Sequence, residues 1–206
     1  MSSVLDIIFA MVLGGVLLLV VISANDIIAE SQATTNGDVL VQEMMTSIAE
    51  IVEGEIRNMG FGASEHEPPV VFADTSNLKF LVDLDKDPIT VIDTVQYFLG
   101  DTTDLARTPN PHDRLLYRRV NGGPAEPKGA VTIFRLQYLT VGGDTITAPV
   151  PPGRLSEIAI VELTLEVQNP QTLFRTLGSV QAGEQEALYS TSVWQQTRLT
   201  SQNSRR

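Results

Sequence analysis

Cysteine is absent from the 206 residues of this chain. A disulfide framework and a thiolate metal site are therefore excluded.

Basic residues are missing from the first quarter of the chain, since no Lys, Arg or His precedes Arg57. Eight acids in residues 1–56 supply most of the net charge of −11. They are Asp6, Asp26, Glu30, Asp38, Glu43, Glu50, Glu53 and Glu55. Phosphate binding needs a basic patch, so a nucleic-acid partner is not expected.

The sequence motifs of common catalytic sites are also missing. There is no G-x-S-x-G elbow, no phosphate loop, no H-E-x-x-H pair and no cysteine nucleophile. Tyr189 and Trp194 lie on the last predicted strand, where packing in a core or at a sheet edge explains them better than a ligand platform. We therefore expect a protein that is not an enzyme and that carries no cofactor, apart from the calcium considered below.

The longest apolar run stands at the start of the chain. Every residue from Ile7 to Ile22 is apolar or Gly. Extended to Val4 and Ala24, the run has about 20 residues, the length that a bilayer-spanning helix needs. We predict a helix over residues 1–24 that spans a membrane or lies in the core of an equally apolar protein bundle. The alternatives are a cleaved signal peptide, which normally begins with basic residues, and a buried core helix, for which the run is too long and uniform.

Three residues of this run are candidates for an assembly site. Asp6 is an acid among aliphatic residues, which is costly unless it is paired or lies at the membrane surface. Gly14 and Gly15 stand in mid-helix, where small residues allow two helices to approach closely. Simple tolerance of Gly in a membrane helix is the other explanation.

Residues 25–60 continue as an amphipathic helix. No proline interrupts the chain between Asp26 and Met59. From Val41 onward, apolar residues recur every three or four positions and predict one buried stripe. The stripe comprises Val41, Met44, Met45, Ile48, Ile51, Val52, Ile56 and Met59. We expect a kink or a short melted stretch at Thr34–Gly37, and a stop at Gly60 and Gly62.

After Gly60 the apolar period changes to two, which is typical of strands. The predicted strands are 78–82, 89–99, 114–120, 131–140, 158–167 and 187–197. We therefore predict an α+β fold with one long N-terminal helix. Its apolar half protrudes, and its amphipathic half packs on an antiparallel β-sheet head formed by residues 61–200. Residues 201–206 are expected to form a disordered tail.

Several short motifs follow one another in a distinctive order. Arg57-Asn58-Met59-Gly60-Phe61 lies at the helix exit, and Asp83-Leu84-Asp85-Lys86-Asp87 precedes a strand. Tyr97, Leu116-Tyr117-Arg118 and Gln137-Tyr138-Leu139-Thr140 follow. With the apolar start, this layout resembles the type IV pilin and pseudopilin family over the whole chain. The head is similar to those of the larger minor pilins, of the PilW type, and of the J-type pseudopilins.

This resemblance implies a structural subunit of a pilus-like filament or secretion pseudopilus. If Met1 is removed, Asp6 becomes the fifth residue, where the family carries an acid, usually Glu. Asp6 would then pair with the terminal ammonium of a neighbouring subunit. The implied partners are other pilin-like subunits, identical or different, and membrane lipid before assembly. The implied location is the bacterial inner membrane, with the head outside the cytoplasm, or an extracellular filament.

Two other functions stay open at this stage. The chain could be a single-pass accessory subunit of another membrane complex that uses a pilin-like shape without polymerising. It could also be a membrane-anchored enzyme or solute-binding domain, which would require a pocket with converging polar groups.

Asp83, Asp85 and Asp87 stand at alternate positions, as the first ligands of a calcium loop do. Pro88 replaces the Gly expected in such a loop, so an acidic turn is the alternative. His66 and His112, each with an acidic neighbour, could also bind a transition metal, but surface loops explain both positions.

Overall fold

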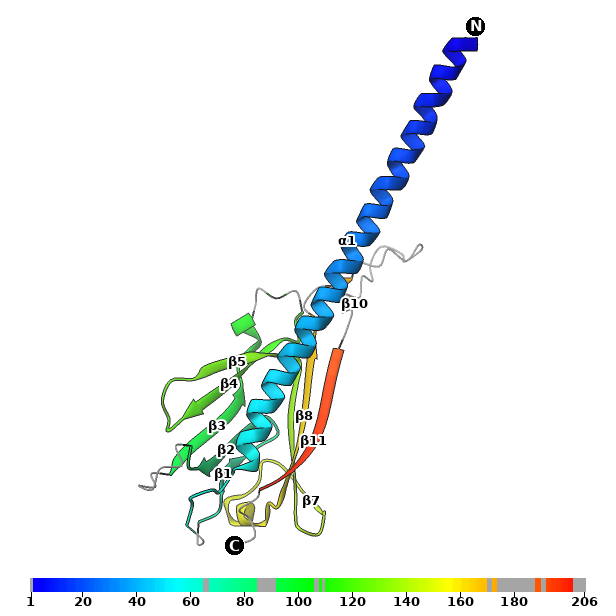
Figure 1. Cartoon of the computed structure of the whole chain (residues 1–206). Coiled ribbons are helices and arrows are strands. Elements are labelled where there is room, and N and C mark those ends of the chain that lie inside the picture. The colour runs from blue at the N-terminus through cyan, green and yellow to red at the C-terminus, as the bar shows by residue number, and fades with distance from the viewer. Residues whose placement is uncertain are drawn as a thin grey trace. The chain divides into compact units, whose positions relative to one another are not determined.

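The fold was determined as a computed structural model that describes residues 2–64, 67–84, 92–105, 108, 110–169, 172–173, 188–189 and 192–201. The chain has an α+β fold in which a long N-terminal helix precedes antiparallel β-sheets, as predicted (Figure 1). The chain divides into two compact units, residues 1–39 and residues 40–206.

Helix α1 (Ser2–Arg57) contains 56 residues. It continues through Thr34–Gly37, so the prediction of a melted stretch there is wrong. The Thr35 hydroxyl donates a 2.9 Å hydrogen bond to the carbonyl oxygen of Ser31, which satisfies the hydroxyl within the helix. The predicted stop is confirmed, because Gly60 and Gly62 adopt φ angles of 78° and 79° just beyond the last helical residue. Glycine reaches this left-handed region without steric cost.

The first sheet has five antiparallel strands in the order β1-β2-β3-β4-β5. They are β1 (Val70–Ala73), β2 (Asn77–Val82), β3 (Asp93–Leu99), β4 (Arg114–Val120) and β5 (Glu126–Val131). The short 3₁₀ helix η1 (Thr102–Leu105) connects β3 and β4. Each strand pairs with its neighbour in sequence, so this sheet is a simple meander.

The second sheet has four strands in the order β11-β8-β6-β7. They are β6 (Ile133–Leu139), β7 (Thr145–Ile146), β8 (Ile160–Gln168) and β11 (Ser192–Thr200). A 3₁₀ helix, η2 (Pro152–Glu157), precedes β8, and β9 (Thr172–Leu173) pairs with β10 (Leu188–Tyr189) as a separate ribbon. The amide of Leu136 donates a 2.7 Å bond to the carbonyl of Thr75, which ties the second sheet to the loop after β1.

Most of the predicted strands are present, whereas β1, β5, β7 and β9 were not predicted. Strand β5 contains Pro127 and Gly129, both disfavoured within strands. It forms the edge of the first sheet, and proline is tolerated there because no further strand needs its missing amide donor. Part of the predicted strand 89–99 lies outside the described residues.

The core lies between the C-terminal part of α1 and the two sheets. Val41, Met45, Ile48, Val52 and Ile56 are buried against strand residues, which confirms most of the predicted stripe. Met44 and Ile51 are each 38% exposed, so their place in the buried stripe was wrong. Both stand at the margin of the buried face. They share this position because residues seven places apart lie on nearly the same side of a helix with 3.6 residues per turn.

Candidate assembly site

The N-terminal part of α1 exposes its apolar side chains. Ser3–Ala29 is a 27-residue stretch with a mean hydropathy of 2.9, and none of it is buried. At 1.5 Å per residue it is about 40 Å long, more than the ~30 Å hydrocarbon core of a bilayer. By length and composition it can cross a membrane, and a signal sequence meets the same criteria. The presence of this apolar helix is thus compatible with the expected membrane association.

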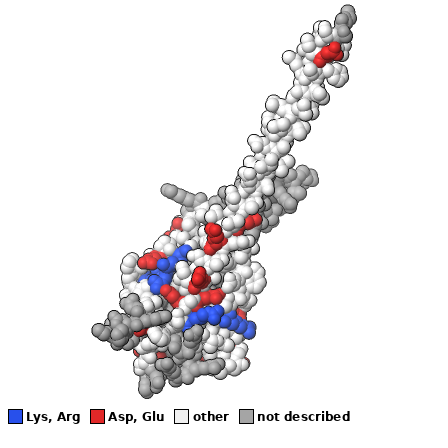
Figure 2. All heavy atoms as spheres, viewed as in Figure 1, with Lys and Arg blue, Asp and Glu red and all other residues white. Residues whose placement is uncertain are grey.

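Asp6 is the only charged residue between Ser2 and Asn25. In Figure 2 this stretch is white apart from one group of acidic atoms near the N-terminal end. The flanking side chains of Leu5 and Ile7 are 59% and 58% exposed. Removing a carboxylate from water is expensive unless a partner compensates its charge. An apolar environment for this segment therefore requires a cationic or hydrogen-bonding partner for Asp6.

Gly14 and Gly15 leave the surface of this helix bare. A Cβ atom built on either residue would meet nothing within 4 Å. Neither glycine is needed for packing within the described chain, and a neighbouring helix could approach the backbone here. Close helix–helix packing at this pair stays a prediction.

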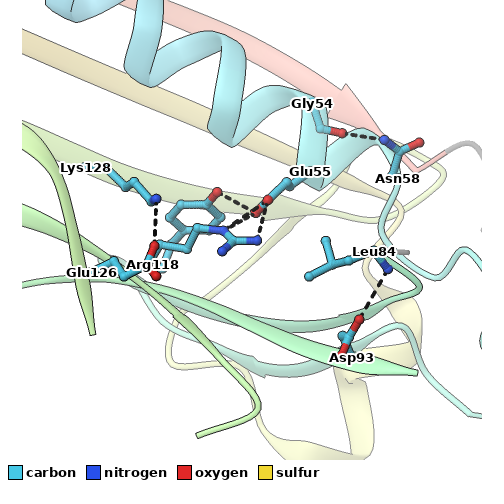
Figure 3. A network of polar contacts seen from close by, with 9 residues as sticks. Gly54, Glu55, Asn58, Leu84, Asp93, Arg118, Glu126 and Lys128 are labelled. Carbon is cyan, nitrogen blue, oxygen red and sulfur yellow. Dashed lines mark hydrogen bonds and ion pairs between the residues drawn. The ribbon is translucent and has the colours of Figure 1, made fainter. Parts of the chain in front are cut away.

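A polar cluster fastens the C-terminal part of α1 to the first sheet (Figure 3). Arg118 on β4 donates from Nε to both oxygens of Glu55 at 3.0 Å, and from Nη2 to Glu55 Oε1 at 2.7 Å. The Tyr97 hydroxyl on β3 donates a 2.6 Å bond to Glu55 Oε2. We call Glu55, Tyr97 and Arg118 the helix–sheet clamp.

The clamp is largely shielded from water. The side chains of Arg118 and Glu55 are 16% and 20% exposed. Burial, and then the charge of Glu55, raise the pKa of Tyr97, so its phenol stays protonated and keeps donating. The hydrogen bonds to Glu55 raise the pKa of Arg118. Beside the clamp, Lys128 and Glu126 form an ion pair of 3.0 Å.

A second polar contact fastens the same helix to the other sheet. Glu53 Oε1 accepts hydrogen bonds from the Gln195 amide at 2.8 Å and from the Thr197 hydroxyl at 2.6 Å, both on β11. Glu53 and Glu55 thus hold one helix to two sheets. Among these described contacts, no nucleophile stands beside a base.

The structure leaves the predicted metal sites without support in the part of the chain that it describes. Asp83 is buried just after β2, whereas Asp85 and Asp87 lie outside the described residues, as does His66. His112 is exposed, and its amide donates to Asn110 Oδ1 at 3.0 Å. Across the described ranges, no three His, Asp or Glu side chains gather as metal ligands would.

The aromatic residues of the last strands have separate positions. Trp194 on β11 is 62% exposed, so of the two expected positions, core or sheet edge, it occupies the edge strand. This exposure follows from the pleat of the strand, because successive residues of β11 face the helix and the solvent in turn. Tyr189 lies on β10, where its backbone pairs with Thr172.

The clamp was not foreseen from the sequence. Tyr97 and Arg118 were noted only as parts of short motifs, and Glu55 only as one of eight acids. Glu55 and Arg118 are 63 residues apart in the chain, so no local spacing links them. The one indication in the sequence was the position of Arg118 inside a predicted strand with a half-buried pattern.

Comparisons with family models, with curated proteins and with solved structures found no match for this chain.

Proposed function

We propose that the chain is a structural subunit of a type IV pilus-like filament or secretion pseudopilus, assembling through its apolar N-terminal helix. The observation that carries this proposal is Ser3–Ala29, a helix with every apolar side chain exposed and one unpaired acid near its start. Such a helix needs lipid before assembly and other helices afterwards. The head has no catalytic role in this proposal.

Asp6 has a specific role in the proposed assembly. It pairs with the N-terminal ammonium of a neighbouring subunit, whether identical or another pilin-like protein. Within the described residues it forms no hydrogen bond or ion pair, so the partner must come from outside the chain or from water. Before assembly the subunit stands in the bacterial inner membrane, with the head outside the cytoplasm.

Electron microscopy of assemblies isolated from the native host, with intact mass spectrometry of the chain, tests the proposal. We expect helical filaments in which the chain begins at Ser2. Discrete particles built on a chain that begins at Met1 would contradict it. That outcome would favour the second candidate, a single-pass accessory subunit, which the same 27-residue span also permits.

Variants of Asp6 separate pairing from simple membrane anchoring. Asp6→Ala should leave membrane insertion intact and abolish incorporation into filaments, because the charge that fixes the neighbouring subunit is gone. Asp6→Glu retains the charge and is the matched control. Normal incorporation of Asp6→Ala would show that the pairing role is wrong.

The glycine pair provides an independent test. Gly14→Leu and Gly15→Leu should fold and insert normally, since a Cβ at either position meets nothing within 4 Å. If helices pack closely here in the assembly, both variants should reduce filament yield. Ala10→Leu, in the same apolar segment, is the comparison variant. Equal yields for all three would remove the glycines from the assembly site.

A further inference from the structure

The first sheet has one face toward α1 and one face away from it. Arg118 reaches Glu55 on the helix side, so the next residue, Arg119, belongs to the opposite face. The strand register places four residues side by side across this outer face. Phe72 pairs with Lys79, Lys79 with Gln96, and Gln96 with Arg119, on strands β1 to β4. We call these four residues the cationic row.

The guanidinium of the row is held by aromatic neighbours. Arg119 Cζ lies 5.0 Å from the ring centroid of Phe98, which in turn stacks on Tyr117 at 5.5 Å. This cation–π contact fixes the side chain without neutralising its charge. Asp104 borders the same face and is engaged by the Tyr117 hydroxyl at 3.2 Å.

The two positive charges of the row have no acidic partner among the described residues. Neither Lys79 nor Arg119 forms an ion pair with any residue of the described ranges. Phe72 adds an exposed aromatic ring at one end, with 42% of its surface accessible. The row therefore presents two positive charges and an apolar group beside the rings of Phe98 and Tyr117.

A surface of complementary character runs along the exposed side of α1. Glu43 and Glu50 are exposed and form no ion pair within the described residues. Next to each stands one of the half-exposed apolar residues, Met44 and Ile51. Figure 2 shows acidic atoms along the C-terminal part of α1 on the side facing the viewer. We call Glu43, Met44, Ser47, Glu50 and Ile51 the helix shoulder.

The spacings of the two surfaces agree. The two acids of the shoulder stand seven positions apart in the helix, so they lie about 10.5 Å from each other along the axis. Lys79 and Arg119 lie two strands apart, which places their Cα atoms about 9.6 Å from each other. A helix laid along the row, across the strands, would bring each acid to one cation and one of its apolar residues near Phe72.

We infer that the helix shoulder of one copy of this chain docks on the cationic row of the next copy. This inference rests on the proposed filament function and identifies one of its subunit contacts. The shoulder and the row lie on opposite sides of the helix-and-sheet layers. A pair of docked copies therefore still has one free shoulder and one free row, so further copies can add by the same contact. Such a head-to-tail contact builds an open filament. Exposed ion pairs add little affinity individually, and here they set register and partner choice.

Cysteine cross-linking tests the contact in assembled filaments of the full chain. The natural sequence has no cysteine, so introduced pairs report without background. Ser47→Cys lies between the two acids, and Gln96→Cys lies between the two cations, so the charges are retained. Mild oxidation of the double variant should give a ladder of covalent dimers, trimers and longer species. Ser47→Cys alone, and Ser47→Cys with Gly153→Cys on η2, should give no ladder.

Charge reversal gives a second measurement. Glu43→Lys with Glu50→Lys should abolish the cross-linked ladder, and adding Lys79→Glu should restore part of it. Circular dichroism checks that each variant retains the fold. Normal filaments without a ladder in the Ser47→Cys, Gln96→Cys chain would overturn this contact and leave the proposed function standing. Failure of the natural chain to form filaments would instead overturn the proposed function.

Discussion

Glu55 offers the sharpest test of how the head is held to its helix. Replacing Glu55 by Gln removes the negative charge and keeps the size of the side chain. Arg118 then retains a buried guanidinium with no counter-charge from the helix, and Tyr97 loses an ionised acceptor at 2.6 Å. The substitution therefore weakens the hydrogen bonds and the ion pair of the clamp without creating a cavity in the core.

The size of the effect follows from the burial of the pair. Breaking a buried ion pair costs about 3–5 kcal/mol, whereas an exposed pair contributes about 0–1 kcal/mol. The clamp side chains are 16% and 20% exposed, which places the pair nearer the buried limit. Glutamine can still accept one hydrogen bond from Arg118. We therefore expect Glu55→Gln to lower the free energy of unfolding of the head by about 2–3 kcal/mol.

Urea unfolding of the full chain in detergent micelles measures this loss, followed by the near-ultraviolet circular dichroism of the tyrosines. With a slope of about 2 kcal/mol/M, the unfolding midpoint should fall by about 1–1.5 M. Glu50→Gln is the matched control, because Glu50 lies on the same helix, is exposed and forms no ion pair within the described residues. Its midpoint should stay unchanged.

Two results would refute this reasoning. A loss below about 0.5 kcal/mol would place the clamp among ordinary surface pairs. An equal cost of Tyr97→Phe in the natural chain and in the Glu55→Gln chain would show that the tyrosine and the carboxylate act independently.

Three further outcomes are expected. Burial raises the pKa of Tyr97 and Tyr138, so these phenols should not titrate in ultraviolet absorbance until the head unfolds. Because the unfolded chain releases these protons near pH 10 and the folded chain retains them, stability should fall as the pH rises above about 10. Gly129→Ala should destabilise the head by about 1–2 kcal/mol, since a Cβ there would lie 2.5 Å from a core side chain of α1, whereas Gly153→Ala should change thermal unfolding little. Trp194 should emit at the wavelength of a hydrated indole, and its replacement by Phe should leave the unfolding midpoint in place.

Where the apolar periodicity is strong, the local sequence pattern was sufficient to predict the element. The apolar run and the spacing of Val41, Ile48 and Val52 specify an α-helix, because burial favours side chains that recur on one face. Alternation in Ala159–Val167 likewise specifies a strand with one buried side. Strands with weak patterns, such as β5 with Pro127, could not be found this way. Their place is set by neighbouring strands and by the edge of the sheet.

The sequence alone predicts an apolar N-terminal helix with one acid, an α+β fold with a β-sheet head, and an uneven distribution of charge along the chain. The tertiary structure alone decided which charges meet. It paired Glu55 with Arg118 across 63 residues, and it placed Lys79 and Arg119 in one row on the outer face of the first sheet. The physical reason is that helix and strand periods act between near neighbours, whereas ion pairs and cross-strand rows depend on how whole elements fold together.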